Sequence, residues 1–333
     1  MPDCKWPSVT SGATMLCPPF MQLRYLEYFV TLARERHFAR AAEICHVAQP
    51  TLSAGLSTLE ETLGQRLVIR DRRFIDLSPE GYAILPFAQQ MLADHQAMRA
   101  ALNSDAGPLR GTLRLGAIPA AMPSVGFLVK ALTAAHAGLQ VSVRSMTSRE
   151  IEQALVARDL DAGITYLSSE PPAQVRSVPL YSEHFVFATR SGTPLAERSS
   201  ITLAEAAEAR LCLLHEGMQN RRILNAGFSE RGLSLEPVAT ADSYVALLSM
   251  VANGDLNAII TDSHSAMLAG HPRLRLIPFS DQLPPNQVGL VIIDREPLSP
   301  LARAAFAVAG KLDLPSPLLA LIDKANQKNP MSI

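Results

Sequence analysis

Residues 38–63 read FARAAEICHVAQPTLSAGLSTLEETL, which is a short helical pattern, a break and a second helical pattern. The first helix has apolar side chains on one face: Phe38, Ala41, Ala42 and Cys45. Pro50 suits the first turn of the second helix, whose expected buried face is Leu52, Leu56, Leu59 and Leu63. A second helix that starts with short polar side chains fits a DNA major groove. The alternative is an ordinary helical hairpin in a protein core.

The flanking residues extend this pattern into a winged helix-turn-helix over residues 21–78. Residues 21–35 have the period of a preceding helix, and Gly64 suits the C-terminal end of the helix before it. Residues 65–70 and 74–77 predict two strands joined by the charged loop Arg70-Asp71-Arg72-Arg73. We expect the arginines of this wing to contact DNA phosphates. The alternative is a solvated charged hairpin.

Residues 79–107 are predicted to form a linker and dimerisation helix. Ser78-Pro79-Glu80 is a helix start, with a capping hydroxyl, a proline at the first position and a carboxylate in the first turn. Apolar positions repeat as in a coiled-coil seam: Leu85, Ala88, Leu92, His95 and Leu102. Pro86 is expected to kink the helix.

Residues 108–325 alternate between helix and strand, so the chain is predicted to be α/β overall. This alternation is typical of mainly parallel, Rossmann-like sheets. The length suits two lobes, the first at about residues 109–180 and 283–325 and the second at about 181–282.

Composition describes an ordinary globular protein, with 48% hydrophobic and 18% charged residues and a net charge of -1. Residues 21–80 hold eight arginines and eight acidic residues, so DNA binding must depend on individual charges rather than on a basic domain. No apolar run has the length of a membrane span. Four cysteines indicate buried thiols in a reducing cytoplasm rather than a disulfide framework. Residues 1–20 contain four prolines and are expected to be a disordered tail, or to follow a start codon that is not used.

Several short motifs together resemble the LysR-type transcriptional regulators. They lie at residues 38–42, 49–53, 59–60, 63–64, 67, 70 and 77–81, with weaker agreement at 111–116 and 160–164. The resemblance implies dimers and tetramers that bend promoter DNA, and a small inducer bound between two lobes similar to those of periplasmic binding proteins. It implies no metal and no cofactor, and RNA polymerase is a candidate partner. The candidate DNA contacts are Arg40, Gln49, Pro50, Thr51, Ser53, Arg70, Arg72 and Arg73.

The sequence departs from this family in its second DNA-binding helix. Ala48 replaces the usual capping serine, and Ala54 and Ser57 stand where basic residues are common. Gly55 in mid-helix costs about 1 kcal/mol of helix propensity. DNA binding should therefore depend on Gln49, on the other short polar side chains of this helix and on the wing.

The sensing site is expected where strand ends and helix starts face each other across the two lobes. The candidate ligand contacts are Pro119, Ala120, Ala121, Thr147, Ser148, Gly217, Met218, Gln219, Asn220 and Thr261. Because backbone N–H groups at helix starts favour anions, the sequence predicts a small carboxylate or similar anion as the inducer. Thr147 with Glu150 is also a capping-box pattern, which is the purely structural alternative.

A redox-responsive regulator of the same family is the main alternative function. The peroxide-sensing branch carries a reactive cysteine after an acidic residue and a glycine, where this chain has Met218 and Gln219 after Glu216-Gly217. Cys212 lies in an apolar strand, which offers a thiol neither a cation nor access. A catalytic function has no support, because the common catalytic motifs are missing from the sequence. A solute-binding protein would need an export signal and would not carry a winged helix.

We expect Gln49→Ala to relax sequence preference, because a glutamine side chain pairs with adenine in the major groove. Arg72→Ala should instead weaken binding to all sequences, since a phosphate contact carries no base information. Mobility shifts over a salt series measure both effects. An equal loss on specific and random DNA for Gln49→Ala would contradict base reading by this residue.

Overall fold

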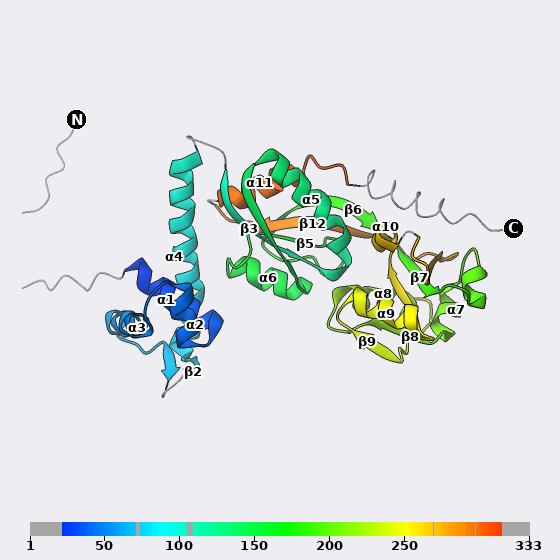
Figure 1. Ribbon diagram of the computed structural model, residues 1–333, viewed down its shortest axis with the longest axis horizontal. Helices are drawn as coiled ribbons and strands as arrows, with labels where there is room; N and C mark the ends of the chain where they lie inside the picture. Colours follow the sequence, from blue (N-terminus) through cyan, green and yellow to red (C-terminus); the bar gives the residue numbers. More distant parts are fainter. Residues whose placement is uncertain (1–21, 71–73, 105–108, 269, 297, 315–333) are drawn as a thin grey trace, which may run out of the picture. The chain divides into compact units, whose positions relative to one another are not determined.

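The computed structural model describes residues 22–70, 74–104, 109–268, 270–296 and 298–314 (Figure 1). The chain divides into two compact units after His95, within helix α4 (Pro79–Ser104). The predicted tail over residues 1–20 and the predicted lobe segment over residues 315–325 lie outside the described residues.

The N-terminal unit is the predicted winged helix-turn-helix. Its elements are α1 (Leu23–Glu35), α2 (Phe38–Ile44), α3 (Gln49–Leu63), β1 (Val68–Arg70) and β2 (Phe74–Leu77). The two strands pair antiparallel, and residues 71–73 between them lie outside the described residues. One core joins the three helices and the wing, and it includes Leu26, Phe29, Leu32, Ala41, Leu52, Leu56, Leu59 and Leu77. Leu63 is 39% exposed, so its predicted place on the buried face of α3 is wrong.

Gly55 explains how α3 packs against α1. A Cβ atom built on Gly55 would lie 2.8 Å from ring carbons of both Tyr25 and Tyr28. Contacts under 3 Å do not occur between real side chains, so only glycine allows this approach of the two helices. The helix-propensity cost of Gly55 is therefore offset by close packing on α1.

The ends of α3 behave as the sequence predicts. Ala48 occupies the N-cap position without a side-chain hydrogen bond, and Gly64 ends the helix with a φ of 66°. Glu60 then connects α3 to the wing, because its carboxylate accepts the backbone N–H groups of Leu67 and Val68 at 2.9 and 3.2 Å.

Helix α4 begins at the predicted cap and carries Pro86 in its interior. The Ser78 hydroxyl accepts the Gly81 N–H at 2.9 Å and donates to the Arg66 carbonyl at 2.5 Å. The predicted dimerisation face is wrong in its first half, since Ala88 is buried and Leu85 and Leu92 pack against the winged-helix core. The large apolar side chains that α4 exposes are instead Tyr82, Phe87, Met91 and Met98.

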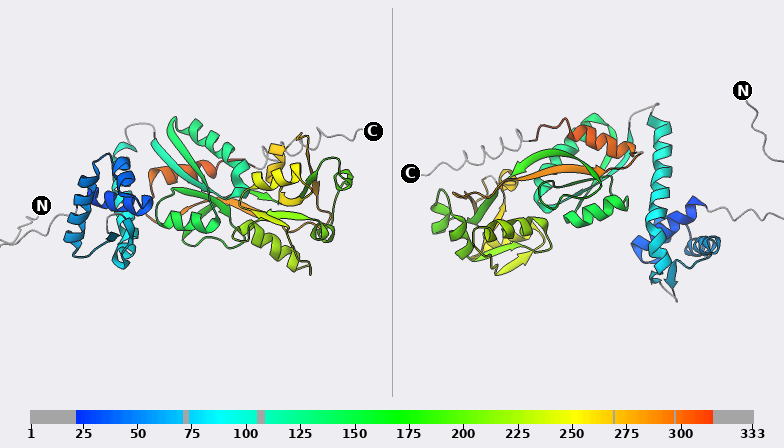
Figure 2. Two further views of the ribbon diagram at one scale, coloured as in Figure 1. Left: turned by 60° about the horizontal axis from the view of Figure 1, so that its bottom comes forward. Right: turned by 180° about the vertical axis from the view of Figure 1, so that it is seen from behind.

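The C-terminal unit consists of two lobes, each built on a five-stranded sheet (Figures 1 and 2). The first lobe has the strand order β4-β3-β5-β12-β6. Its elements are β3 (Arg110–Ala117), η1 (Pro119–Ala121), α5 (Met122–Ala135), β4 (Gly138–Ser145), α6 (Ser148–Val156), β5 (Ala162–Tyr166), β6 (Val175–Glu183), β12 (Asn286–Ile293) and α11 (Pro300–Ala309).

The second lobe has the strand order β11-β7-β10-β8-β9. Its elements are β7 (Phe185–Arg190), η2 (Pro194–Glu197), α7 (Leu203–Glu208), β8 (Leu211–Leu214), α8 (Gln219–Ser229), β9 (Ala239–Ala241), α9 (Tyr244–Asn253), β10 (Asn257–Thr261), η3 (Asp262–His264), α10 (Ser265–Leu268) and β11 (Leu274–Pro278). The chain crosses between the lobes at Glu183–Phe185 and returns to the first sheet through β12.

The prediction of mainly parallel sheets needs correction. Strands β4, β3 and β5 are parallel, but β12 pairs antiparallel with both β5 and β6. In the second sheet β10, β8 and β9 are parallel, whereas β7 pairs antiparallel with β10 and β11. Strands β6, β9 and β11 were not predicted, and β6 and β11 supply antiparallel edges of the mixed sheets.

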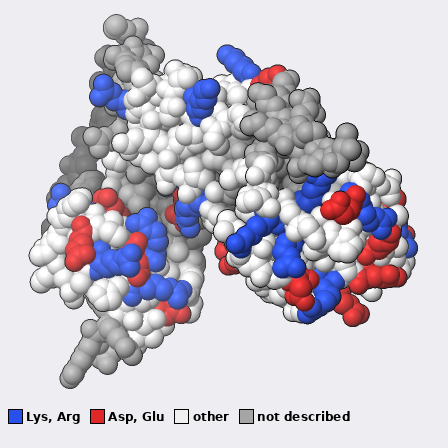
Figure 3. Space-filling view, turned by 45° about the vertical axis from the view of Figure 1, so that its right-hand side comes forward, with Lys and Arg blue, Asp and Glu red and all other residues white. Residues whose placement is uncertain are grey.

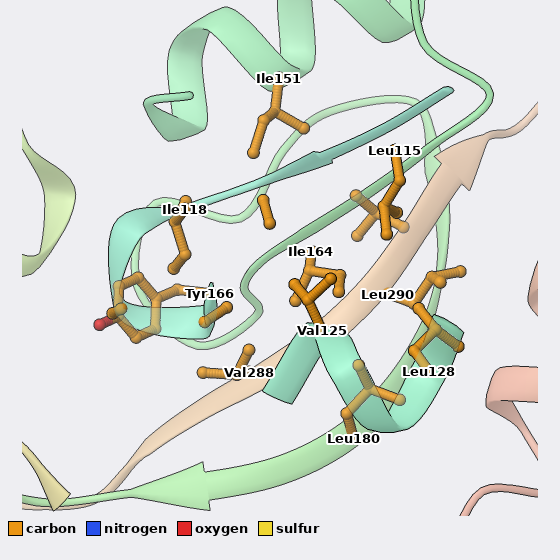
Figure 4. Packing of buried hydrophobic residues seen from close by; sticks show 14 of the residues in the cluster. Leu115, Ile118, Val125, Leu128, Ile151, Ile164, Tyr166, Leu180, Val288 and Leu290 are labelled. Carbon is orange, nitrogen blue, oxygen red and sulfur yellow. The ribbon is translucent and has the colours of Figure 1, made fainter. Parts of the chain in front are cut away.

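Helices α5 and α11 cover one face of the first sheet and α6 covers the other (Figure 1). The core between the layers is aliphatic, with Leu115, Leu128, Ile151 and Ile164 fully buried. Figure 4 shows the ring of Tyr166 at one end of this core, with its hydroxyl pointing away from the aliphatic side chains. Among the described helices, none is both long and apolar enough to cross a membrane.

We expect Gly55→Ala to destabilise the protein by about 1–3 kcal/mol, because overpacking against the tyrosine rings outweighs a helix-propensity gain of about 1 kcal/mol. Gly126→Ala in α5 is the matched control, since a Cβ there meets nothing within 4 Å. That control should gain up to about 1 kcal/mol. Urea unfolding followed by circular dichroism compares the two variants, and an equal gain at both glycines would contradict the packing explanation.

Candidate functional site

The start of α3 forms the candidate DNA-reading surface. Gln49, Pro50 and Thr51 are exposed, and Ser53 is half-buried one turn further along. Because the N-cap is Ala48, no side chain caps this end of the helix. Pro50 has no N–H, and the Thr51 N–H donates to the Ala48 carbonyl at 2.9 Å. The positive end of the helix dipole, rather than a set of free N–H groups, is therefore what favours a phosphate here.

Positive charge around this helix is sparse. Arg40 is 71% exposed, and its Nε lies 3.0 Å from Oε2 of Glu35, so part of its charge is already paired. Arg70 belongs to β1, while its side chain and the predicted contacts Arg72 and Arg73 lie outside the described residues. On the face shown in Figure 3, basic and acidic side chains are intermixed rather than gathered into a broad basic surface.

The candidate effector site is a small cavity between the two lobes. Its volume is about 10 Å³, which is room for about one water-sized molecule. Seven of the predicted ligand residues line it: Pro119, Ala120, Thr147, Ser148, Met218, Gln219 and Asn220. Ile118, Tyr166 and Leu214 complete the lining. Strand ends of the first lobe therefore face the start of α8, as the sequence predicts.

Gln219 closes this cavity through hydrogen bonds at both atoms of its side-chain amide. The oxygen accepts from the Ser148 hydroxyl, and the nitrogen donates to the carbonyl of Ser169. Both partners belong to the first lobe, whereas Gln219 begins α8 in the second. The side chain is 3% exposed, so these bonds are shielded from water.

A second cross-lobe contact lies beside the first. The Arg222 guanidinium binds both carboxylate oxygens of Glu170, and its Nε lies 2.9 Å from Oε1. This pairing lowers the pKa of Glu170. Arg222 also donates to the Gly217 carbonyl at 2.8 Å, which ties the loop before α8 to the same contact. The lobes are thus held together at the mouth of the cavity.

A buried polar chain passes behind the cavity. The Asn220 amide donates to the Tyr166 hydroxyl at 2.7 Å, and that hydroxyl donates to Oε1 of Glu183 at 2.6 Å. Burial raises the pKa of Glu183 to about 8, and the negative charge of Asp262 acts in the same direction. Glu183 is therefore mainly protonated at neutral pH.

Three predicted ligand residues do not line the cavity. Ala121 is fully buried, and its carbonyl accepts the Ser124 hydroxyl. Gly217 is exposed, and Thr261 is buried with its hydroxyl 2.9 Å from that of Ser263. Thr147 does form the predicted capping box with Glu150 while also lining the cavity.

Sequence reasoning missed Tyr166, Glu183 and the Arg222–Glu170 pair. Tyr166 is the last residue of β5, so the rule of searching at strand ends, which selected Thr147, could have found it. Glu183 lies in a strand that was not predicted, and nothing in the local pattern marks it.

Of the two cysteines that the structure describes, Cys212 is buried and Cys45 is half-buried. Burial raises the pKa of Cys212 to about 11, and its sulfur lies against the Leu247 carbonyl at 3.7 Å. Burial also raises the pKa of Cys45, which packs against the winged-helix core. Neither thiol has the low pKa of a reactive cysteine. Within the described ranges, no cluster of three metal-binding side chains occurs.

A winged helix-turn-helix joined to a two-lobed α/β domain with an interlobe cavity defines a DNA-binding transcription regulator with a sensor domain. Two family models match the chain. "Bacterial regulatory helix-turn-helix protein, lysR family" covers residues 23–82, and "LysR substrate binding domain" covers residues 106–312. The chain belongs to the family of LysR-type transcriptional regulators.

Several similar proteins are described by name as activators of hydrogen peroxide-inducible genes. The chain is 33% identical to "Probable hydrogen peroxide-inducible genes activator" of Mycobacterium avium, over 80% of this chain and 86% of that protein. It is 30% identical to "DNA-binding transcriptional dual regulator OxyR" of Escherichia coli K12, over 70% of this chain and 77% of that protein. A solved full-length OxyR variant from Pseudomonas aeruginosa shares 29% identity and a TM-score of 0.69, covering 89% and 98% of the two chains.

Stability should fall as the pH rises towards about 8, because the folded protein holds the Glu183 proton more tightly than the unfolded chain. This contribution is complete below the ordinary pKa of 4.5 and is lost as the pH passes about 8. Glu183→Gln keeps an acceptor for Tyr166 and removes the titration, so its unfolding free energy should vary less between pH 7 and 8.5. Urea unfolding at each pH tests this, with the exposed Glu208→Gln as control. A pH slope unchanged by Glu183→Gln would contradict this assignment.

Proposed function

We propose that this protein is a bacterial LysR-type regulator that binds promoter DNA and responds to an oxidant at the cavity between its lobes. The observation that carries the proposal is the size of that cavity, about 10 Å³, which leaves room for about one water-sized molecule and none for an organic inducer. The name of its relative in Mycobacterium avium, a probable hydrogen peroxide-inducible genes activator, supports the same class of signal. The redox alternative is thus better supported than the carboxylate inducer.

The electrostatics of the cavity also weigh against the predicted anionic inducer. Among the described lining residues there is no lysine or arginine to pair with a carboxylate. Arg222 is close by, but its guanidinium already binds Glu170. The residues that face the cavity offer hydroxyl and amide groups, which suit a neutral polar molecule.

The oxidisable group in this proposal is the thioether of Met218. Its side chain is half-buried and lines the cavity beside Gln219, whereas Cys212 is buried and Cys45, also half-buried, lies in the winged-helix unit away from the cavity. The sulfur takes one oxygen atom from hydrogen peroxide, the O–O bond breaks and water leaves. The product is a polar sulfoxide whose oxygen competes for the donors that now hold the lobes together. Oxidation would thereby shift the lobes towards a more open arrangement.

The DNA-binding unit reads the promoter with the start of α3, supported by the wing. In this proposal α4 pairs two chains through its exposed apolar side chains, including Phe87, Met91 and Met98. Helix α3 contains no basic residue, so each chain alone is expected to bind DNA weakly. Dimers and tetramers would compensate by binding the promoter through several chains at once. Promoter binding places the protein in the cytoplasm, with RNA polymerase as a second partner.

We expect Met218→Leu to abolish the change in promoter binding that follows treatment of the full-length protein with hydrogen peroxide or hypochlorous acid. Leucine keeps the volume and cannot form a sulfoxide. Met250→Leu is the matched control, because Met250 is also half-buried but does not line the cavity. Mobility shifts and intact-protein mass spectrometry follow binding and oxidation together.

Two outcomes would overturn this assignment. Loss of the response in a Cys45→Ser, Cys212→Ser double variant, with retention in Met218→Leu, would identify a thiol as the sensor. A response to small carboxylates with none to oxidants would restore the inducer mechanism.

A further inference from the structure

Three arginines gather in the DNA-binding unit where α1 ends and α2 begins. Arg34 lies in the last turn of α1, Arg36 ends that helix with a φ of 53°, and Arg40 lies in the first turn of α2. Their side chains are 57%, 65% and 71% exposed. Glu35 lies between two of them, and its side chain is only 16% exposed. This corner therefore presents positive charge to solvent, although α3 contains no basic residue.

Glu35 binds two of these arginines at once. Its Oε1 accepts from Nε of Arg34 at 3.0 Å, and its Oε2 lies 3.0 Å from Nε of Arg40. Because both guanidinium groups meet one carboxylate, they lie beside each other although they belong to different helices. The terminal nitrogens of Arg34 and Arg40 form no hydrogen bond with the residues that the structure describes. Two neighbouring guanidinium groups thus keep their outer N–H groups available.

The two ion pairs of Glu35 contribute little to folding. Ion pairs between exposed side chains are weak, because water screens the charges and the long side chains lose freedom when they pair. The same loss of freedom is useful for binding. An arginine must become ordered when it binds a ligand, and an arginine that is already ordered loses less on binding.

The donors at this corner suit a DNA phosphate. A guanidinium is planar, and its fork of N–H groups matches two oxygens of a phosphate. In a helix-turn-helix the second helix enters the major groove, while the first helix crosses the DNA backbone. Here α3 is the second helix and α2 is the first, so Arg40 lies on the helix that crosses the backbone.

We propose that Arg34 and Arg40 form a clamp for one DNA phosphate, and that Glu35 is the positioning residue that orders both guanidinium groups before DNA arrives. Glu35 acts through the arginines and does not itself contact DNA. The clamp gives α2 an anchor that is independent of base sequence, which compensates for the basic residues that α3 lacks. This inference concerns DNA binding alone and does not rest on the oxidant response.

The test is binding of the full-length protein to a fluorescent DNA duplex of random sequence, because phosphate contacts carry no base information. Glu35→Gln removes a negative charge, so a purely electrostatic role predicts tighter binding. Positioning predicts the opposite, with binding weakened at least about threefold at about 200 mM salt, where long-range attraction is screened. With Arg40→Lys already present, Glu35→Gln should no longer weaken binding, since an ammonium has no planar fork to orient.

The salt dependence counts the phosphates that the clamp binds. Replacing Arg34 and Arg40 together by methionine should reduce the slope of log K against log salt by about 0.9, which is the contribution of one phosphate. Arg190→Met with Arg303→Met also removes two exposed charges, but outside the DNA-binding unit. This control pair should leave the slope unchanged.

Glu43→Gln is the matched control for Glu35→Gln, because Glu43 is an exposed carboxylate of α2 outside the clamp. It should bind DNA at least as tightly as the unsubstituted protein. The proposal is overturned if Glu35→Gln binds as tightly as this control at about 200 mM salt. It is also overturned if the double arginine variant loses no slope, or loses about 1.8, since the arginines would then bind no phosphate or two separate ones.

Discussion

The amide of Gln219 makes hydrogen bonds to the first lobe with both its oxygen and its nitrogen. An amide carries a strong acceptor and a strong donor on the same carbon, so one side chain can join two partners at once. A thiol in this place would be a weak donor and a weak acceptor, and could not hold Ser148 and Ser169 together. The closure of the cleft, its small volume and the alignment of α8 with the first lobe depend on this contact, with the Arg222–Glu170 pair beside it as a second support.

Burial selects the neutral forms of the titratable groups behind the cleft. Glu183 has a pKa raised to about 8 and His264 has one lowered to about 4, so each is uncharged near pH 7 for the same reason. The polar side chains where the chain crosses between lobes can therefore hydrogen-bond without the large penalty of a buried charge.

In the DNA-binding unit, the constraint is close packing between helices rather than polar contacts. Three short helices need a close approach to bury enough surface, and Gly55 permits it by removing the side chain that would meet Tyr25 and Tyr28. Glu60 fixes the wing to the same helix. Helix α3 is thus held firmly by packing although it carries few charges. Its position, rather than its charge, is what suits it to enter a DNA groove.

The sequence by itself determined the winged helix, the long helix after Ser78, the α/β alternation and most of the residues that line the interlobe cavity. These features follow from short-range spacing, caps and strand ends, which are local properties of the chain. It did not determine the antiparallel partners of β12 and β7, the face of α4 that stays exposed, or the bonds of Gln219. Each of these depends on residues far apart in the chain, as with Gln219 and Ser148. Only the tertiary structure decides them, because a side chain such as Gln219 has the same local pattern whether it meets solvent, a ligand or the opposite lobe.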